Sequence, residues 1–426
     1  MPVTPEEAEQ RLLSLELFGM RFGLDRMRRL MTALGHPERS FDSIHVVGTN
    51  GKSSTTRMIA AILTRHGRRS GSYLSPHLVG FNERIRVADQ DITPQQFADA
   101  IERTLRATEQ VNRASVGDDD LVTQFELLTA AAYSELAAEG VDVAVIEAGL
   151  GGRYDATNVI PSKVQVLTSV GLEHTRWLGP TITAIAREKL DVVRPGGMLV
   201  LGAGMHPEAL AVARETVAQR GASIVQADAD PHATVGALGN FQRRNFALAR
   251  AAAEAFLGEL DEAAVEAAAA DVRVPGRMQV VDQGPLTLLD GAHNPDGIVA
   301  LTESLPEIIA GARTGEGRVA AVISILDDKD AVRMLHSLAP LCDALVFCAS
   351  HNPRVLPPPT LSSLLDQLAP EITIDHEIVR APHAALRRAR ELAGPDGVVI
   401  ATGSLYLISD LMHDEDTNST RRASML

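Results

Sequence analysis

The chain has 426 residues, more than one ordinary domain uses, so roughly two or three domains are expected. It is 45% hydrophobic and 22% charged, a globular composition, and its formal net charge of −15, with no basic stretch, argues against nucleic-acid binding. Neither a signal peptide nor an apolar run long enough to span a membrane is visible, and cysteine is scarce. We therefore expect a cytoplasmic protein that binds neither membranes nor nucleic acid.

Residues 4–35 are predicted to be helical, with Thr4 as the N-cap residue and Pro5 at the first helical position. Residues 18–27 interrupt these helices with two glycines among bulky apolar side chains. The stretch has two interpretations, helix-hairpin packing or an apolar lip for a flat ligand. Composition alone favours packing.

The best-defined feature is the segment Gly48-Thr49-Asn50-Gly51-Lys52-Ser53-Ser54. It lies between a predicted buried strand at 43–47 and a predicted helix at 55–65. A strand, a glycine turn and a helix N-terminus in this order form a nest for a phosphate group. The loop is shorter than the common pattern, because Val46 stands where that pattern has a glycine. The alternative is a surface turn followed by a helix.

The residue types in this segment suit a phosphate ligand. Gly48 and Gly51 let the backbone approach closely, and the free N–H groups of the first helical turn point at the anion. Lys52 adds a full positive charge, and either Ser53 or Ser54 offers a hydroxyl to Mg²⁺. We therefore predict nucleoside triphosphate binding here.

Three further strands end in polar side chains. They are predicted at residues 71–74, 141–146 and 164–170. Ser75 follows the first, Glu147 the second and His174 lies just past the third. Each has a structural alternative: a turn, a turn cap and a surface histidine. Together, at strand ends beside a phosphate loop, they are candidates for holding Mg²⁺, although imidazole is an unusual ligand for so hard a cation.

The remaining chain continues the alternation of strand and helix, which predicts an α/β fold with a doubly wound, mostly parallel sheet. A helix at 181–190 carries Arg187-Glu188-Lys189, which by itself is a charged, solvated face. The helical pattern breaks at Pro275-Gly276-Arg277, and we place a domain boundary near residue 273.

A second, smaller Rossmann-like α/β domain is predicted beyond this boundary. Its strands are expected at residues 286–289, 318–325, 344–348 and 398–402. The predicted organisation is an ATP-binding domain at 1–272, a C-terminal domain at 273–412 and a polar, disordered tail at 413–426.

Taken together, these motifs resemble the Mur-type ATP-dependent amide ligases, and within them the folylpolyglutamate synthase/dihydrofolate synthase family. The resemblance covers roughly residues 15–410. Besides the phosphate loop, it is carried by Ser75-Pro76-His77-Leu78 with Phe81-Asn82-Glu83-Arg84-Ile85, residues 147–158, Gly171-Leu172-Glu173-His174-Thr175, Arg187-Glu188-Lys189, Pro275-Gly276-Arg277, Asp290-Gly291-Ala292-His293-Asn294-Pro295 and Gly403-Ser404-Leu405-Tyr406. Each segment is modest evidence, but their joint order and spacing are highly specific.

The resemblance implies a reaction. ATP phosphorylates the γ-carboxyl of a folate glutamate tail, or the benzoate carboxyl of dihydropteroate, and the amino group of L-glutamate attacks the acyl phosphate. Such chemistry mainly requires that anions be positioned and their charge neutralised. The implied partners are these small molecules alone, and a monomer is expected.

The resemblance also assigns roles to residues. Lys52 and the loop hold the phosphates, with Asn245, Arg277 and Asp290 around the nucleotide. Two Mg²⁺ ions are held by Ser75, Glu147 and His174, with Ser53 or Ser54 near the first ion. Lys189 matches a lysine that is often carbamylated and then supports the second metal; His293 and Ser404 match positions near the incoming glutamate. Phe22, Leu24 and Arg26 fall in the segment that matches the pterin side.

Three departures from the family pattern stand out. Ser53 replaces a usual glycine, Leu190-Asp191-Val192 replaces Ala-Gly-Ile, and Phe241-Gln242 replaces His-Gln. Asp191 is expected to place a new carboxylate near the second metal or its lysine. A Mur-type ligase that joins a different acid to a different amine therefore stays open as an alternative. A nucleotide-binding switch protein is a second, and an oxidoreductase is less favoured because no Gly-x-Gly-x-x-Gly follows the first strand.

Overall fold

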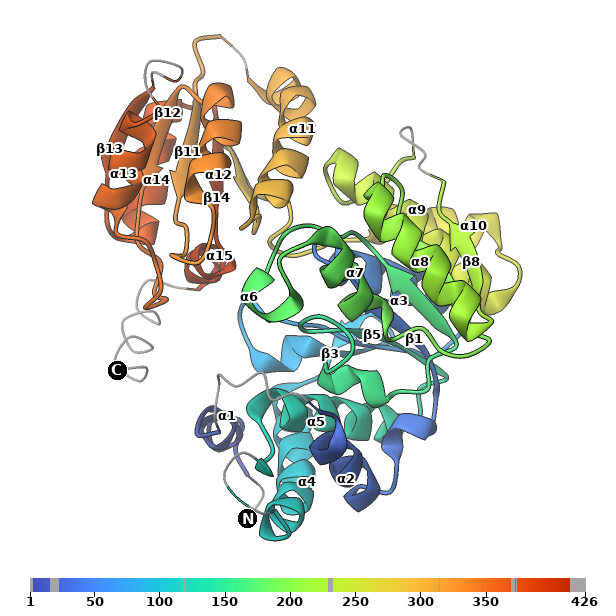
Figure 1. The fold of residues 1–426 in the computed structure, drawn as a ribbon. Helices are drawn as coiled ribbons and strands as arrows, with labels where there is room; N and C mark the ends of the chain where they lie inside the picture. The colour runs from blue at the N-terminus through green and yellow to red at the C-terminus, as the bar shows by residue number, and fades with distance from the viewer. Residues whose placement is uncertain are drawn as a thin grey trace. The chain divides into compact units, whose positions relative to one another are not determined.

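The computed structural model describes residues 3–15, 23–115, 117, 120–228, 233–313, 315–368, 372 and 374–413 (Figure 1). Contacts divide the chain into two compact units, Met1–Gly236 with Arg243–Val272 and Ala237–Gln242 with Arg273–Leu426. None of the helices within the described ranges combines the length and apolar character of a membrane span.

The first unit contains an 8-stranded sheet in the order β4-β3-β2-β5-β1-β6-β7-β8. Its strands are β1 (Asp42–Val47), β2 (Ser70–Tyr73), β3 (Ile85–Val87), β4 (Gln90–Asp91), β5 (Val143–Glu147), β6 (Val164–Leu167), β7 (Met198–Leu201) and β8 (Ser223–Gln226). All pair in parallel except β3 and β4, which form an antiparallel edge. The mostly parallel sheet confirms the predicted fold class, whereas the sequence did not indicate this edge.

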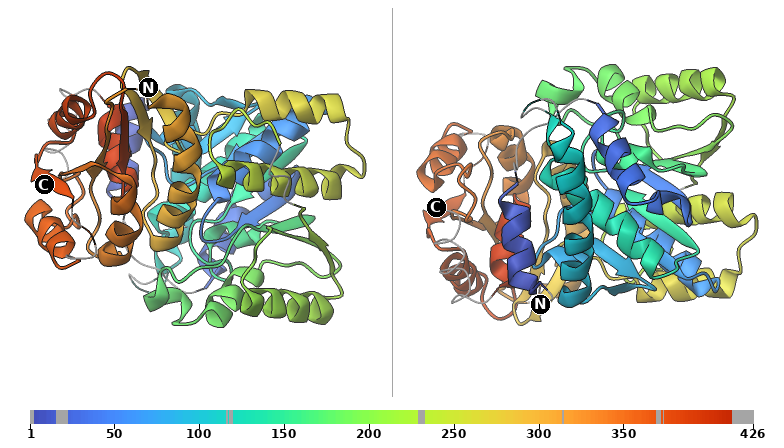
Figure 2. Two further views of the ribbon diagram at one scale, coloured as in Figure 1. Left: turned by 90° about the horizontal axis from the view of Figure 1, so that it is seen from above. Right: turned by 90° about the horizontal axis from the view of Figure 1, so that it is seen from below.

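Helices cover the first sheet on both sides (Figures 1 and 2). They are α1 (Pro5–Leu13), α2 (Asp25–Ala33), α3 (Lys52–Arg65), α4 (Pro94–Arg113), α5 (Gln124–Ala138), α6 (Thr175–Leu178), α7 (Ile182–Leu190), α8 (Pro207–Arg220), α9 (Asn240–Leu257) and α10 (Glu262–Asp271), with short 3₁₀ turns at Pro37–Arg39, Phe81–Arg84 and Ala156–Val159. Helices α4 and α5 pack together over one face, and α10 packs on α3 at the other. The apolar faces so buried hold the strand ends in place.

The second unit is built around a 6-stranded sheet in the order β13-β12-β11-β14-β10-β9. Its strands are β9 (Gln279–Gln283), β10 (Leu286–Leu289), β11 (Val319–Ile323), β12 (Ala344–Phe347), β13 (Asp375–Ile378) and β14 (Val398–Thr402). Its helices are α11 (Pro295–Ala312), α12 (Ala331–Leu338), α13 (Pro358–Asp366), α14 (Pro382–Ala393) and α15 (Leu405–Met412), with a 3₁₀ turn at Ala339–Leu341. Only β9 among them pairs antiparallel, with β10.

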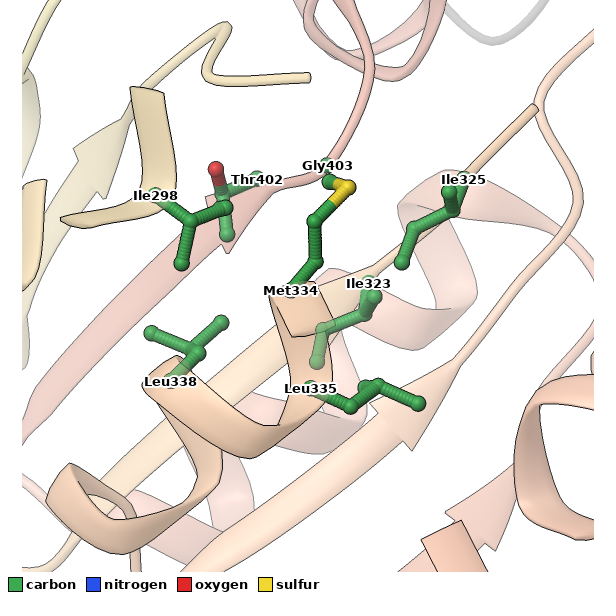
Figure 3. Close-up of a pocket in the computed structure, with 8 residues that line it drawn as sticks. All are labelled: Ile298, Ile323, Ile325, Met334, Leu335, Leu338, Thr402 and Gly403. Carbon is green, nitrogen blue, oxygen red and sulfur yellow. The ribbon is translucent and has the colours of Figure 1, made fainter. Parts of the chain in front are cut away.

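An apolar layer supports the end of β14 in the second unit. Figure 3 shows it, and it is lined by Ile298, Ile323, Ile325, Met334, Leu335, Leu338, Thr402 and Gly403. These residues leave no room for a water molecule between them. The turn at Gly403 therefore rests on a closely packed support, which fixes the start of α15.

Candidate active site

The predicted phosphate loop is fixed by the end of the neighbouring strand β6. The backbone N–H groups of Thr49 and Asn50 donate to the carbonyl and hydroxyl oxygens of Ser169, both at 2.9 Å. Gly48 has φ 154°, and a Cβ there would lie 1.9 Å from the Thr168 hydroxyl oxygen. Only glycine fits this close approach, so strand pairing sets the shape of the loop.

The charge of Lys52 is held over this loop. Its Nζ donates to the carbonyl oxygens of Gly48 and Thr49, each at 3.1 Å. Gly51 adopts the left-handed conformation, with φ 87°, and α3 begins at Lys52. A Cβ on Gly51 would lie 2.6 Å from Oδ1 of Asn245, so Asn245 lies beside the loop as well. The charge of Lys52 and the N-terminus of α3 together favour the binding of an anion at this loop.

A hydroxyl and a carboxylate meet next to the loop. Ser53 Oγ donates to Glu147 Oε1 at 2.8 Å, and the backbone N–H of Ser75 donates to Glu147 Oε2 at 3.2 Å. Glu147 is only 1% exposed. These hard oxygen donors suit Mg²⁺, so this part of the site fits the cation that the family resemblance implies. The structure thus distinguishes Ser53, which contacts Glu147, from Ser54, which is buried.

His174 is less closely tied to these groups. It precedes α6 in the left-handed conformation, its side chain is 39% exposed, and Nε2 lies 4.0 Å from Glu173 Oε1. Within the described ranges, no three or more His, Cys, Asp and Glu side chains converge as a metal site. Its role as a metal ligand therefore stays a prediction.

Lys189 is not a solvated lysine. It is 4% exposed, and its Nζ donates to the carbonyl oxygen of Gly48 at 2.8 Å. Burial, with a smaller contribution from the Lys52 charge, lowers the pKa of Lys189 to about 7, against opposing carboxylates that include Glu173. The amine therefore carries a proton only part of the time near neutral pH.

The glycine-rich segment after Glu147 packs directly on the helix that carries Lys189. The Arg153 N–H donates to the Glu188 carbonyl at 2.9 Å, and a Cβ on Gly152 would lie 2.6 Å from the Lys189 carbonyl oxygen. The bare glycine backbone therefore lets this segment contact the end of α7.

The glycine-rich segment after Glu147 is also held by a buried network of polar side chains, which the sequence analysis did not predict. Asp155 accepts hydrogen bonds from the Leu150 N–H at 2.7 Å and from the Thr157 hydroxyl. Thr157 Oγ1 in turn lies 2.8 Å from Nε2 of His45, in β1, and its carbonyl accepts from Tyr133 Oη at 3.0 Å. The sequence did offer a signal for this network, because His45 and Tyr133 are polar residues within apolar stretches of a strand and a helix.

Asp191, the departure expected to place a carboxylate near the second metal or Lys189, has other partners. It pairs with Arg220 at 2.5 Å and with Arg153 at 3.4 Å. Two guanidinium groups thus neutralise this carboxylate. The aspartate at this departure from the family pattern therefore belongs to an ion-pair cluster at the end of α7.

The predicted pterin-side residues are only partly described. Phe22 lies outside the described residues, and Leu24 is the half-buried N-cap residue of α2. Arg26 is buried, and its Nε donates to Glu126 Oε1 at 3.1 Å. Substrate binding by these three residues stays a prediction.

The predicted residues of the second unit gather at the carboxyl ends of its strands. Asp290 is buried after β10 and accepts from the N–H groups of Met278 and Ala292 at 2.9 and 2.8 Å. Burial raises its pKa, and the charge of Arg277 opposes that shift. His293 Nδ1 donates to the Gly291 carbonyl at 2.8 Å.

Ser404 lies at the end of β14, where its hydroxyl accepts from the Tyr406 N–H at 3.1 Å and caps α15. The turn before it is tight, because a Cβ on Gly403 would lie 2.7 Å from the Ser324 carbonyl oxygen. Phe241, one of the departures, packs with the apolar core of the second unit.

Comparison with known proteins agrees with this geometry. Residues 276–405 match the Mur ligase glutamate ligase domain family. The chain is 31% identical over 424 residues to a dihydrofolate synthase/folylpolyglutamate synthase of Bacillus subtilis, covering 92% of this chain and 95% of that protein. Folylpolyglutamate synthase of Mycobacterium tuberculosis complexed with ADP superposes with a TM-score of 0.86, at 31% identity, over 96% of this chain and 98% of that one.

The bifunctional synthase of Yersinia pestis, solved with AMPPNP and a Mn ion, matches at a TM-score of 0.83 and 27% identity, over 96% of this chain and 97% of that one. The phosphate loop, the buried Glu147 beside it and the second α/β unit, taken with these matches, define the class of ATP-dependent ligases of the Mur type. The chain belongs to the dihydrofolate synthase/folylpolyglutamate synthase family of these ligases. The predicted family, fold class and enzyme class are thus confirmed.

Proposed function

We propose that this protein joins L-glutamate to the glutamate tail of a folate in an ATP-dependent reaction, with dihydropteroate as a second acid to be tested. The observation that carries the proposal is the contact of Ser53 with Glu147, at the end of β5, beside the phosphate loop of Lys52. This arrangement, in a chain of this family, suits phosphoryl transfer to a carboxylate.

In the first step, the acid carboxylate attacks the γ-phosphorus of ATP, ADP leaves, and an acyl phosphate forms. Lys52 and the N–H groups at the start of α3 bind the phosphates and offset their charge. Divalent cations, which we propose to be two Mg²⁺ ions, would be held by Ser53, Ser75, Glu147 and His174, and when bound they neutralise charge on the phosphates. Asn245, Arg277 and Asp290 are proposed to bind the nucleotide.

Lys189 is proposed to be carbamylated. A protonated amine repels a metal ion, whereas reaction of the neutral amine with CO₂ gives an anionic carbamate. The burial of Lys189 and its contact with Gly48 support this proposal, because a buried amine at the first residue of the phosphate loop is close to the proposed metal ligands. An intact-mass shift that disappears on removal of CO₂, and is absent from Lys189→Ala, would test it.

In the second step, the amine of L-glutamate attacks the acyl carbon and phosphate leaves. His293 and Ser404 are proposed to bind the incoming amino acid, and Phe22, Leu24 and Arg26 to contact the acid substrate. A monomeric, cytoplasmic enzyme that takes only small-molecule partners is part of the same proposal.

The test is ADP release by the purified protein with MgATP and L-glutamate, with dihydropteroate and tetrahydrofolate offered separately and products identified by mass. We expect release with tetrahydrofolate and a product heavier by one glutamate residue. Release with both acids would make the protein bifunctional. No glutamate-dependent release with either acid would contradict the folate assignment and favour a Mur-type ligase with another acid substrate.

A further inference from the structure

A histidine–aspartate pair in the second unit has no role in the function described so far. The His351 backbone N–H donates to Asp410 Oδ2 at 2.9 Å, and its ring Nδ1 lies 2.5 Å from Oδ1 of the same carboxylate. The Asp410 side chain is 4% exposed and the His351 side chain 18% exposed. An ionised carboxylate only accepts hydrogen bonds, so Nδ1 carries a proton, and whenever the ring is neutral Nε2 keeps its lone pair.

The pair lies at the strand-end edge that carries the predicted amino-acid residues of this unit. His351 follows β12, and its ring makes an edge contact with Tyr406, with centroids 5.4 Å apart. Tyr406 is in turn bound through its N–H to Ser404. Ser350, the residue before His351, and Ser324 follow the ends of β12 and β11, and their hydroxyl oxygens lie 3.2 Å apart. Contacts therefore run without a gap from Ser404 to His351.

Two histidines of this edge both donate a hydrogen bond from Nδ1 but to different partners. His293 donates from Nδ1 to a backbone carbonyl, whereas His351 donates to a buried carboxylate. A carboxylate in that place fixes the ring and compensates the charge that it gains on taking a proton. Within the described part of the chain, no residue hydrogen-bonds His351 Nε2, and this atom is not closed off from solvent.

We propose that His351, oriented by Asp410, is the base that deprotonates the incoming amino acid, an inference that rests on the proposed ligase function. L-Glutamate arrives as an ammonium ion and cannot attack until it loses a proton. His351 Nε2 takes that proton, the nitrogen lone pair forms the C–N bond, and the bond between the acyl carbon and the phosphate oxygen breaks. The departing phosphate takes the second nitrogen proton, and His351 returns the first to solvent.

The test compares two nucleophiles. Hydroxylamine is uncharged near neutral pH and traps acyl phosphates as hydroxamates without a base. In His351→Gln, kcat with saturating L-glutamate is expected to fall by about 100-fold or more, whereas hydroxamate formation from the same acid and ATP changes by less than about threefold. Asp410→Asn should show the same selective loss to a smaller extent. His376→Gln, a half-buried histidine within β13 near Asp366, is the matched control and should retain both rates.

Each other outcome overturns the inference. Equal loss with glutamate and hydroxylamine would mean that His351 supports folding or acyl-phosphate formation. A raised KM for glutamate with unchanged kcat would make it a carboxylate anchor, and unchanged kinetics would make it a bystander. If the unmodified protein forms no acid-dependent hydroxamate, the proposed function itself fails, which the other outcomes leave intact.

Discussion

The Nζ atom of Lys189 lies 2.8 Å from the carbonyl oxygen of Gly48, so the last turn of α7 is tied to the first residue of the phosphate loop. Lys52 Nζ donates to the same carbonyl oxygen at 3.1 Å. Two amines thus share one acceptor in a largely buried place, and their mutual repulsion contributes to the low pKa of Lys189.

Replacing this buried amine should separate stability from activity. In Lys189→Met we expect ligation to be lost and the free energy of unfolding at pH 6 to rise by about 1–3 kcal/mol. The sign follows from the lowered pKa of Lys189: the unfolded lysine keeps its proton up to its ordinary pKa of 10.5, whereas the folded one releases it at about 7. The destabilisation that comes from burying the charged amine is therefore complete below pH 7 and decreases towards pH 10.

Urea unfolding in CO₂-free buffer at several pH values measures this difference. The surface lysine Lys163, paired with Asp42 at 2.6 Å and 60% exposed, provides the control, and Lys163→Met should change stability by no more than about 1 kcal/mol. A Lys189→Met protein that is equally or less stable at pH 6 would contradict the prediction.

The glycine-rich segment should not tolerate a methyl group at Gly152. A Cβ there meets the carbonyl oxygens of Lys189 and Glu188 at 2.6 and 2.9 Å, and backbone atoms cannot rotate away. We expect Gly152→Ala to lower stability by about 1–3 kcal/mol and to reduce ADP release strongly. Gly311→Ala, where nothing lies within 4 Å in a helix, should be neutral or slightly stabilising. Equal effects of the two changes in thermal melts and activity would contradict this account.

The magnesium requirement of serine variants should show whether Ser53 or Ser54 supplies the hydroxyl that binds Mg²⁺. Ser53 contacts Glu147, whereas Ser54 is 3% exposed within the helix. Ser53→Ala should raise the Mg²⁺ concentration for half-maximal ADP release by about 10-fold or more, and Ser54→Ala should leave it within about twofold. Titration of Mg²⁺ at fixed ATP gives the answer, and the reverse order would reassign the hydroxyl.

Acid should destabilise the first unit partly through His45. This fully buried ring has its pKa lowered to about 3, chiefly by burial and also by Arg194. On unfolding, the ring recovers its ordinary value of 6.5, so below that pH the unfolded state binds a proton that the folded state does not. Stability from this group is complete above pH 6.5 and is lost as the pH falls towards 3.

Comparison with His45→Gln isolates this contribution, because a glutamine N–H can still reach Thr157. Between pH 7 and pH 5, the free energy of unfolding of the unmodified protein should fall by about 2 kcal/mol more than that of the variant. Parallel pH dependence of the two proteins in urea unfolding would show that His45 does not control the acid response.

Much of the first unit could be predicted because its signals are local. The glycines and lysine of the phosphate loop follow a run of apolar residues, and α3 begins directly at Lys52. The antiparallel strands β3, β4 and β9 escaped prediction, since they lie at or next to a sheet edge and their burial does not alternate clearly. Residues 237–242, which precede the predicted boundary, group with the second unit because of contacts that spacing does not reveal.

The sequence by itself determined the alternation of strand and helix, the phosphate loop and the polar residues at strand ends, because each depends on neighbours along the chain. Only the tertiary structure decided which hydroxyl meets Glu147, that Lys189 is a buried amine against Gly48, and that Asp191 pairs with Arg153 and Arg220. These facts arise where strands and helices distant in sequence are brought together. Burial at such places changes the protonation and the partners of a lysine or a carboxylate, and no pattern of neighbouring residues along the chain reveals this change.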